Sequence, residues 1–435
     1  MKASYIKKSF LRTIFSMNND PSAFVKHPGI DFTRNRKCPF SALILLILSL
    51  DRSSLNREIR RFFNKISSPV ITKSAFIQQR TKLNDTAFPF LFSALNDILP
   101  FKKTFRGYHL LACDGSDLNV PPLDGDVSTR VASNTSGVSY YQFHLNAVFD
   151  ILEERYTDIF LQPRAQFDER KAFLTFLSRN PVSGKCIFIA DRGYFSLNIL
   201  SHLLHSEHSF ILRVNSDDLK VSFLKRFQLP DSAEFDIPLT FSVTRSQRKI
   251  YRDHPEKYVC IRRNRTFDLI LPDDRSSVLP LSCRLVKLEL PGGGSEFLIT
   301  DLSSKSFPKD VIRELYRLRW GIETSFRFLK YNVALNYFHS IRREFIIQEI
   351  YARMILYNFT MMIVSHTDLP EKGTKYQYKI SISDAVVTCR DFLIHRLKNE
   401  EITELLCRYL TEIRPGRTCP RKSRSKRYIS FNNRG

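Results

Sequence analysis

Two short apolar runs, each leading into an aspartate, constrain the fold of this chain more than any other feature. The run Tyr108–Cys113 leads into Asp114, which a glycine follows at once. The run Cys186–Ala190 leads into Asp191, with a glycine two residues later. Short apolar runs bounded by turn residues are typical of buried strands. We therefore expect two buried strands that each carry a carboxylate at the tip, although either aspartate alone would more often be a turn or capping residue.

The segments around these two runs alternate in the manner of an α/β protein. Two further strands and a helix are expected between the aspartates, and a helix and a strand after Asp191. These six segments are His144–Ile151, Arg155–Leu161, Phe167–Arg179, Ser196–Ser206 and Phe210–Val214, together with the run that ends at Ala190. Asp117, just beyond the first turn, is the carboxylate most easily mistaken for Asp114 as the functional residue.

Residues 215–301 are predicted to be strand-rich. The expected strands are Thr240–Thr244, Tyr258–Arg262, Thr266–Leu271, Arg284–Leu290 and Glu296–Thr300. The last two flank Pro-Gly-Gly-Gly-Ser, which is a hairpin signal. This pattern indicates an all-β insertion within an α/β domain.

The first 105 residues are rich in Leu, Ile and Phe and are predicted to be helical, with a buried helix at Ala42–Leu50. Ser54–Lys65 and Thr72–Leu83 have suitable lengths for a helix-turn-helix around a Ser-Ser-Pro turn. The second helix carries side chains that could contact bases and phosphates, namely Lys73, Ser74, Gln78, Gln79, Arg80 and Lys82. A plain helical hairpin with a solvated face explains the same pattern equally well.

The stretch Tyr316–Lys330 is predicted to be one amphipathic helix. At about 100° per residue, its apolar positions fall in an arc of about 80°; they are Val311, Leu315, Leu318, Ile322, Phe326 and Leu329. A neighbouring arc holds one acid, Glu323, among donors suited to phosphate oxygens: Tyr316, Arg319, Arg327 and Lys330. An ordinary charged helix surface, with Glu323 paired to Arg319 or Arg327, explains this spacing equally well.

The spacing of Tyr316, Arg319, Glu323 and Lys330, with the context Arg-Trp-Gly-Ile-Glu, resembles the Tyr-Arg-Glu-Lys signature of the insertion sequence four family of bacterial DDE transposases. The resemblance covers roughly residues 40–430. It implies an α/β fold with a ribonuclease-H-like catalytic core, which an all-β insertion interrupts. It also implies that Asp114, Asp191 and Glu323 are the catalytic acids and metal ligands.

Three carboxylates gathered at one point repel each other by roughly 4 kcal/mol for each close pair. A divalent cation reverses the sign of this energy, and oxygen-only ligands favour Mg²⁺ or Mn²⁺ over zinc. Two such ions, about 4 Å apart, would activate a water or a DNA 3′ hydroxyl and stabilise the leaving oxygen. We therefore expect two Mg²⁺ or Mn²⁺ ions as the cofactor.

The resemblance assigns DNA contacts to the other signature residues. Tyr316, Arg319 and Lys330 would hold phosphate oxygens near the cleaved end, and Arg327 lies in the same arc. Relatives carry an aromatic residue, often tryptophan, shortly before the signature to stack a flipped base. Here Phe297 takes that place, because the only tryptophan is Trp320. Phe297 is therefore a candidate for stacking, with a role in the core of a strand as the alternative.

The resulting domain organisation has six parts. They are a helical N-terminal DNA-binding domain (1–105), the first part of the core (106–214), the β insertion (215–301), the second part of the core (302–366), C-terminal helices (367–413) and a basic tail (414–435). The C-terminal helices are expected at Phe345–Val364, Asp384–Leu397 and Glu400–Ile413. The tail is expected to be disordered and to add affinity for phosphates.

Charge and cysteine content restrict the partners. The 67 basic and 44 acidic residues give a net charge of +23, which implies a polyanionic partner. The eight cysteines form no Cys-x-x-Cys pair, which argues for a reducing, intracellular setting. The longest apolar run is too short to span a bilayer, so no membrane association is expected. The resemblance implies a bacterial cytoplasmic protein at the nucleoid, with double-stranded DNA as its partner and a homodimer as its DNA-bound form.

The predicted function is cut-and-paste transposition, in which the enzyme cleaves DNA at terminal inverted repeats and joins the ends to target DNA. Two alternatives remain open at this point. A structure-selective nuclease on the same core would hydrolyse DNA without strand transfer. A DNA-binding protein with an idle site would bind DNA without any chemistry.

Overall fold

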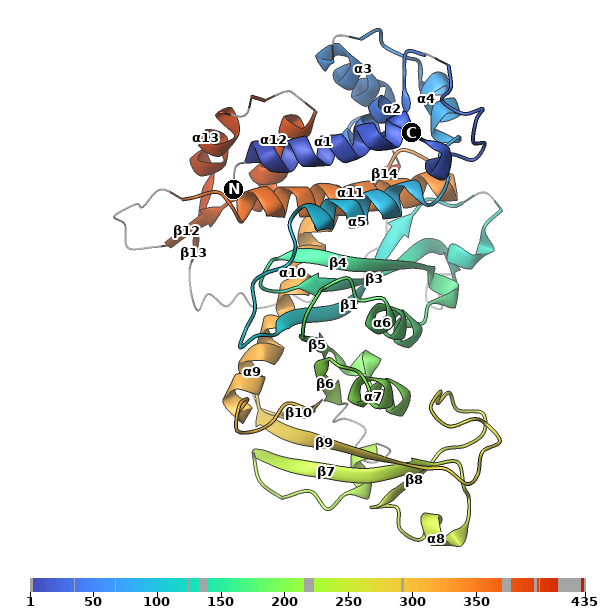
Figure 1. Cartoon of the computed structure of the whole chain (residues 1–435), viewed down its shortest axis with the longest axis vertical. Coiled ribbons are helices and arrows are strands. Elements are labelled where there is room, and N and C mark those ends of the chain that lie inside the picture. The colour runs from blue at the N-terminus through green and yellow to red at the C-terminus, as the bar shows by residue number, and fades with distance from the viewer. Residues whose placement is uncertain are drawn as a thin grey trace.

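The computed structural model describes residues 3–34, 36–66, 68–123, 125–132, 139–214, 223–290, 293–369, 377–394, 397–398, 400–413 and 432–433. The described chain is elongated, with helices at one end, a large sheet through the middle and a β-rich part at the other end (Figure 1). Its sheet runs through most of this length, so the molecule is a mixed α/β protein.

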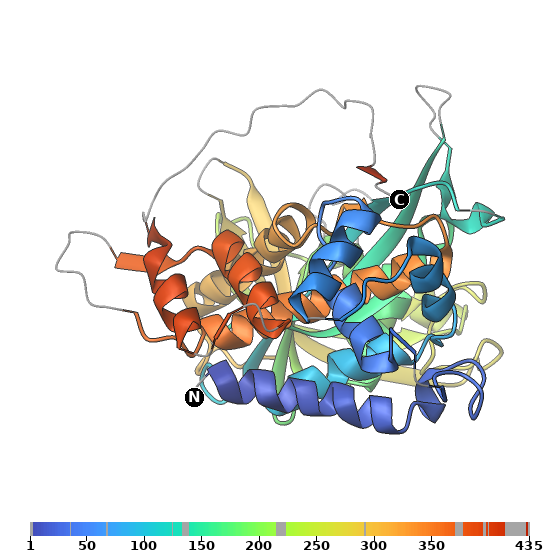
Figure 2. The same cartoon turned by 90° about the horizontal axis from the view of Figure 1, so that it is seen from above.

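The N-terminal segment is helical, as its composition predicts. Its helices are α1 (Ala3–Asn19), η1 (Ser22–Phe24), α2 (Phe40–Ser49), α3 (Leu55–Lys65), α4 (Lys73–Arg80) and α5 (Ala87–Ile98). Every residue of α2 is buried, because the helix is apolar on all sides and other helices surround it. These helices lie together with α11 (Arg343–Val364) and α12 (Ile382–Leu393) at one end of the molecule, and the view from above looks down onto them (Figures 1 and 2).

The sheet has ten described strands. Their order is β2-β3-β1-β5-β6-β10-β9-β7-β8, and β4 pairs with the outer side of β3. The strands are β1 (His109–Val120), β2 (Arg130–Val131), β3 (Tyr140–Asp150), β4 (Arg155–Pro163), β5 (Cys186–Ala190), β6 (Ser209–Val214), β7 (Phe235–Thr244), β8 (Tyr258–Cys260), β9 (Val278–Glu289) and β10 (Ser295–Thr300). At its centre β1, β5 and β6 run parallel.

The strand-rich segment differs from the expected separate all-β unit. Strand β10 pairs with β6 of the central sheet, and β9, β7 and β8 continue outward from β10. The predicted strand Thr266–Leu271 is wrong, because this stretch consists of turns around the buried side chains of Phe267 and Ile270. The predicted insertion therefore extends the central sheet at its edge.

Helices cover both faces of the central strands. On one face lie α6 (Glu169–Ser178) and α7 (Leu197–Leu204), whose apolar side chains share a core with Leu111 and Cys113 of β1. On the other face lies α10 (Trp320–Tyr331), which shares a core with Ala112 and Leu118 (Figure 1). Alternate residues of β1 thus face different helices, as the strand period of two requires.

The helix predicted around the signature is divided into α9 (Lys309–Leu318) and α10. At the junction the amides of Arg319 and Ile322 bond carbonyls three residues back, at 3.1 Å each. The two helices pack against different hydrophobic clusters. Leu315 of α9 belongs to the cluster that lies against β5 and β6, and Phe326 of α10 belongs to the cluster that includes the N-terminal helices. The predicted apolar stripe is therefore wrong at Leu318, which is 39% exposed at the end of α9.

The C-terminal part contains more strands than predicted. Beyond α11 and α12, the helix expected at Glu400–Ile413 is α13 (Glu401–Arg408) followed by strand β13 (Leu410–Ile413), which pairs with β12 (Gln377–Ile380). The remaining short elements are η2 (Val127–Thr129), η3 (Arg164–Gln166), η4 (Arg192–Tyr194), η5 (Phe223–Arg226), α8 (Lys249–Arg252), β11 (Tyr337–Phe338) and β14 (Asn432–Asn433). Apart from β14, the predicted basic tail lies outside the described residues. None of the helices in the described part of the chain has the length and apolar composition needed to traverse a bilayer.

Candidate active site

The two aspartates singled out in the sequence are neighbours in the structure. Strands β1 and β5 pair in parallel up to the partners Cys113 and Ala190, so Asp114 and Asp191 are the next residues on adjacent strands. Adjacent strands are about 4.8 Å apart. Asp191 follows the end of β5, as predicted. Asp114, however, does not lie at a strand tip, because β1 continues to Val120 by pairing with β3.

Helix α10 brings Glu323 to the same place. Ile322, Phe326 and Leu329 are buried on the side of the helix that packs on β1. Glu323 lies beside this apolar stripe and remains partly exposed. Packing of these apolar side chains on β1 therefore fixes how far the Glu323 carboxylate lies from the strand. We refer to Asp114, Asp191 and Glu323 as the carboxylate site.

Two signature residues connect the three acids. The buried Arg319 donates Nη2 to Glu323 Oε1 at 3.0 Å, and its Nη1 lies 3.8 Å from Asp114 Oδ2. The Tyr316 hydroxyl donates to Asp191 Oδ1 at 3.1 Å. The simple pairing of Glu323 with Arg319 is therefore present, but it is one part of a larger network.

The electrostatics of the site reflect crowded negative charge. Burial raises the pKa of Asp114 to about 6, and the charges of Glu323 and Asp191 act in the same direction against that of Arg319. For Arg319, burial alone would lower the pKa of the guanidinium, but Tyr316 and the three acids outweigh it and raise that pKa. Each acid thus lies within the field of the others.

The carboxylate site fits a hard divalent cation in its chemistry. All three side chains offer oxygen ligands, and a cation would offset both the burial of Asp114 and the smaller repulsion from Glu323 and Asp191, which together raise its pKa. Within the described ranges, no three His, Cys, Asp or Glu side chains are close enough together to hold an ion. The guanidinium of Arg319 lies between Asp114 and Glu323. Convergence of these acids on one ion therefore requires Arg319 to move.

The other predicted contact residues lie at different depths. The Lys330 ammonium is partly buried and donates to the Asp117 carbonyl at 2.8 Å, and burial lowers the pKa of this group. Arg327 is exposed on α10. Phe297 is only 4% exposed, and its ring packs at 6.1 Å from that of Phe235. The structure thus places Phe297 in the core, which contradicts its assignment as an exposed stacking residue in this conformation.

The predicted recognition helix is also partly structural. On α4 the side chains of Gln79 and Arg80 are buried, and Arg80 bonds Glu349 of α11 at 2.9 Å. They are therefore unable to contact bases in this conformation. Lys73, Ser74, Gln78 and Lys82 remain at least partly exposed.

Sequence analysis missed two charged neighbours of Asp191. Arg213 of β6 places Nη1 at 3.6 Å from Asp191 Oδ1 and Nε at 3.2 Å from Glu296 Oε1 of β10. Burial raises the pKa of Glu296. Their positions near the ends of apolar strands were the available signal, but the pairing of β6 with β10 was needed to bring them together.

A third missed group lies behind the glycine that follows Asp114. His144 of β3 contacts Asp117 Oδ1 through Nδ1 at 2.7 Å and Glu169 Oε1 through Nε2 at 3.1 Å. Arg164 Nε lies 3.1 Å from the same Asp117 oxygen. Asp117, the competing carboxylate, is thus held by His144 and Arg164 away from the carboxylate site. Glu169 resembled a first-turn helix acid in the sequence, so nothing there singled it out.

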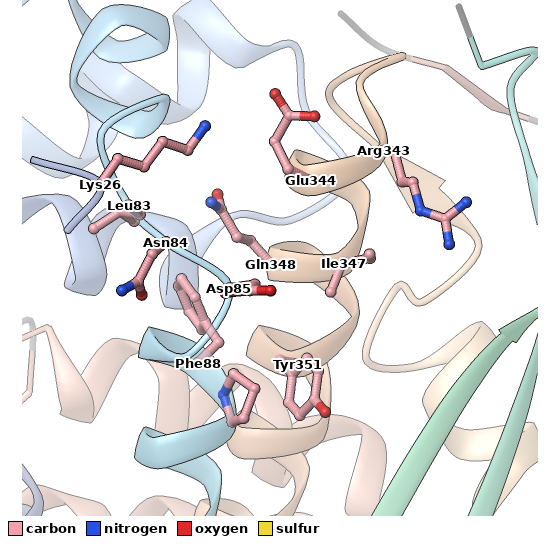
Figure 3. Close-up of a pocket in the computed structure, with 11 residues that line it drawn as sticks. Lys26, Leu83, Asn84, Asp85, Phe88, Arg343, Glu344, Ile347, Gln348 and Tyr351 are labelled. Carbon is pink, nitrogen blue, oxygen red and sulfur yellow. The ribbon is translucent and has the colours of Figure 1, made fainter. Parts of the chain in front are cut away.

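The described residues also form an insertion groove and a helical groove outside this site. The insertion groove, of about 1000 Å³, is lined by α6, α7 and the segment 259–268, and Arg170, Lys171, Arg262 and Arg265 are among its residues. The helical groove, of about 460 Å³, lies between the α4–α5 connection and α11. The helical groove has Phe88 on its α5 side and Tyr351 on its α11 side, with Lys26 and Glu344 toward the opposite end from these rings (Figure 3).

Parallel strands that place two aspartates side by side, with a glutamate supplied by a covering helix, form a set of carboxylates of the kind that holds divalent metal ions in enzymes acting on phosphodiesters. The chain belongs to the family of proteins with a transposase DDE domain, whose family model matches residues 106–359. It is therefore a DDE transposase, a class of enzyme that uses divalent metal ions and acts on DNA.

Comparison with solved structures adds a distant likeness. The cryo-EM structure of the piggyBac transposase synaptic complex with hairpin DNA matches with a TM-score of 0.45 and 12% sequence identity. The match covers 96% of this chain and 84% of that chain. Comparison with curated proteins gave no match.

Proposed function

We propose that this protein is a cut-and-paste transposase of the insertion sequence four family. It cleaves DNA at the terminal inverted repeats of its element and transfers the ends into target DNA. The observation that carries the proposal is the network in which Tyr316 and Arg319 join Asp191, Asp114 and Glu323. Tyr316, Arg319 and Glu323 belong to the signature. Asp114 and Asp191 are predicted from the two apolar runs, independently of the signature.

In this proposal Asp114, Asp191 and Glu323 hold two Mg²⁺ or Mn²⁺ ions. When bound, such ions activate the attacking water or 3′ hydroxyl and stabilise the leaving oxygen. In the metal-free site the positive charge of Arg319 offsets the charge of the carboxylates. Bound cations would take over this compensation, so the Arg319 guanidinium could bind a phosphate oxygen instead. Tyr316 lies on the Asp191 side and donates its hydroxyl to a second oxygen. Both side chains thereby orient the phosphodiester.

Lys330 and Arg327 extend the proposed DNA contacts along α10. Lys330 lies two turns beyond Glu323 and already has an ammonium hydrogen bond to a main-chain carbonyl. Arg327 is exposed between them. Cations on this line would follow a phosphate backbone as it leaves the carboxylate site.

The core is assigned to the ribonuclease-H-like class on the basis of its strand order. An antiparallel unit of β1, β3 and β4 precedes parallel β5 and β6, and helix α6 lies between β4 and β5. With this core, the proposed domain organisation keeps the helical N-terminal DNA-binding domain (1–105), the two parts of the core (106–214 and 302–366), the C-terminal segment (367–413) and the basic tail (414–435), whereas residues 215–301 extend the central sheet. The DNA-bound form is proposed to be a homodimer in the bacterial cytoplasm, at the nucleoid.

The test uses purified full-length protein and labelled DNA that carries the ends of the element. Mg²⁺, Mn²⁺, Ca²⁺ and EDTA are compared, and products are mapped at nucleotide resolution. We expect metal-dependent cleavage at the element boundary and joining to a second DNA. Cleavage without end selectivity or joining would instead indicate a nuclease, and binding without cleavage in any metal would indicate a DNA-binding protein.

The substitution Glu323→Gln tests the site itself. It keeps the size of the side chain and its contact with Arg319 but removes the charge that a cation needs. We expect loss of cleavage by at least a thousandfold, with DNA binding retained, since one ligand of the reacting centre is lost. Cleavage at the wild-type rate would refute the assignment of Glu323.

A further inference from the structure

Two glycines near the catalytic aspartates have no explanation in backbone conformation. Gly115 directly follows Asp114, and Gly193 lies two residues after Asp191. Neither belongs to the glycines with positive φ. Another residue type would therefore fit the backbone at both positions, and what disfavours a side chain there lies in the surroundings.

The surroundings of both glycines contain the same carboxylate. A Cβ atom at Gly115 would lie 3.0 Å from Glu169 Oε1 and 2.3 Å from the Nε2 atom of His144. At Gly193 it would lie 3.1 Å from Glu169 Oε2. A side chain at Gly115 would thus collide first with His144 and then with Glu169, and a side chain at Gly193 would press on Glu169. The carboxylate of Glu169 thus lies between the backbone segments that carry Asp114 and Asp191.

Glu169 is held in this place from behind. It is the first residue of α6, where Asp168 caps the helix by accepting from the amides of Arg170 and Lys171 at 3.0 Å each. Its Oε1 contacts His144, which Asp117 supports from the other side. Its Oε2 lies toward Gly193. The side chain is 29% exposed, so one side of the carboxylate remains accessible.

A buried hydroxyl group lies within the electrostatic field of both Asp114 and Glu169. Tyr194 of η4 is 2% exposed, and within the described ranges its hydroxyl has no hydrogen-bond partner. Burial raises the pKa of this phenol, and the charges of Asp114 and Glu169 raise it further. An unpartnered buried hydroxyl costs free energy unless a ligand or its bound water completes its hydrogen bonds.

We propose that Glu169 is a fourth carboxylate of the metal centre, in addition to Asp114, Asp191 and Glu323. This inference rests on the proposed function. Two divalent cations carry four positive charges. Three carboxylates neutralise only three of them, and a fourth carboxylate makes the ligand charge equal to the cation charge. Glu169 would supply, from the α6 side of the site, a hard oxygen donor of the kind that Mg²⁺ and Mn²⁺ prefer. The alternative is a purely structural brace between α6 and β3.

Metal binding can be measured without any turnover. The full-length protein, free of DNA, is titrated with Mn²⁺, and the free ion is followed by electron paramagnetic resonance. The variants are Glu169→Gln, Glu323→Gln and, as a matched control, Glu207→Gln, which removes an equal charge from an acid that is 88% exposed. We expect Glu169→Gln to weaken Mn²⁺ binding by about tenfold or more, as loss of a supporting or direct ligand does.

The outcomes separate the two proposals. If Glu323→Gln weakens binding while Glu169→Gln binds like wild type, the role of Glu169 is overturned and the proposed function stands. If neither variant differs from Glu207→Gln, both fail. Melting temperatures in EDTA establish that each variant is folded. Should Glu169→Gln not fold, Glu169→Asp keeps the charge and withdraws the carboxylate from both glycines, and wild-type Mn²⁺ affinity in that variant would overturn the inference.

Discussion

Buried charge ties the N-terminal helices to the rest of the protein. The guanidinium of Arg80 bonds Glu349 Oε1 at 2.9 Å and Gln348 Oε1 at 2.7 Å, and the amide of His339 donates to Glu349 Oε2 at 3.1 Å. Burial alone would raise the pKa of Glu349, but Arg80 and His339 outweigh it and lower this pKa to about 2. The ionised form of Glu349 is thus strongly favoured in the folded state.

This pKa shift predicts loss of stability in acid. A carboxyl group with a folded pKa near 2, against an ordinary value of 4.5, stabilises the fold fully above pH 4.5. The contribution disappears as the pH falls from about 4.5 to 2, and amounts to about 3 kcal/mol. Unfolding by guanidinium chloride at pH 7, 5 and 3 measures it.

The control for this prediction is a pair of substitutions. Glu349→Gln leaves Arg80 without a counter-charge in the interior, so we expect a loss of about 3–5 kcal/mol at pH 7. Its stability should then depend less on pH below 4.5 than that of wild type. Glu314→Gln, on the exposed side of α9, should change neither quantity. Equal pH dependence in Glu349→Gln and wild type would contradict the assignment.

At the scale of single elements, strand β10 decides between two roles for Phe297. In the structure its ring packs on Phe235 within the core between the sheet and α7. Phe297→Leu keeps most of this volume and should cost less than about 1.5 kcal/mol without affecting cleavage. Phe297→Ala should cost about 3–5 kcal/mol. Thermal unfolding and the cleavage assay are compared for both variants. Loss of cleavage in a stable Phe297→Leu protein would instead support stacking on a base.

Elements with their own local pattern could be predicted from the sequence. Strand β5 has its expected bounds because an apolar run and a turn define both ends. Strand β1 extends seven residues beyond the predicted end at Cys113, since pairing with β3 continues where local polarity suggested a turn. The break at Arg319 likewise depends on two separate cores beneath α9 and α10.

The candidate site was predictable only in part, for the same reason. Asp114, Asp191 and Glu323 each carry a local signal, a strand end or a helical signature. Glu169 and Arg213 carry none that distinguishes them from other charged residues on a helix or strand. Their proximity to the aspartates arises from the positions of α6 and β6 in the fold. Long-range packing of this kind is invisible to a pattern of neighbouring residues.

For the molecule as a whole, the insertion groove is a candidate path for DNA. Arg170, Lys171, Arg262 and Arg265 are exposed, and the side-chain contacts of the described residues show no acidic partner for them. The acids beside them are engaged: Asp168 caps α6, and Asp268 bonds Asn198 at 2.7 Å. Positive charge is thus left available along the groove.

Charge reversal in the groove should weaken DNA binding. Replacing Arg262 and Arg265 by glutamate removes two phosphate contacts, which should reduce the slope of log K against log salt by about 2. The matched control replaces Arg248 and Arg275, which are exposed elsewhere in the insertion, and alters the net charge equally. Fluorescence anisotropy at several salt concentrations measures both. Equal slopes in the two double variants would exclude the groove as the path.

The segment that carries Arg262 and Arg265 is held in shape by another arginine. Arg245 is 5% exposed, and its guanidinium donates to the carbonyls of Ile270 and Phe267 at 2.9 Å and to that of Arg262 at 3.2 Å. Asp268 fixes the same segment to α7 through Asn198 and His202. A loop that is ordered before its ligand arrives gives up little conformational entropy on binding. The cations of the insertion groove are therefore presented to a polyanion at a fixed spacing, and the shape of the nucleic acid backbone, as well as its charge, governs which partners fit.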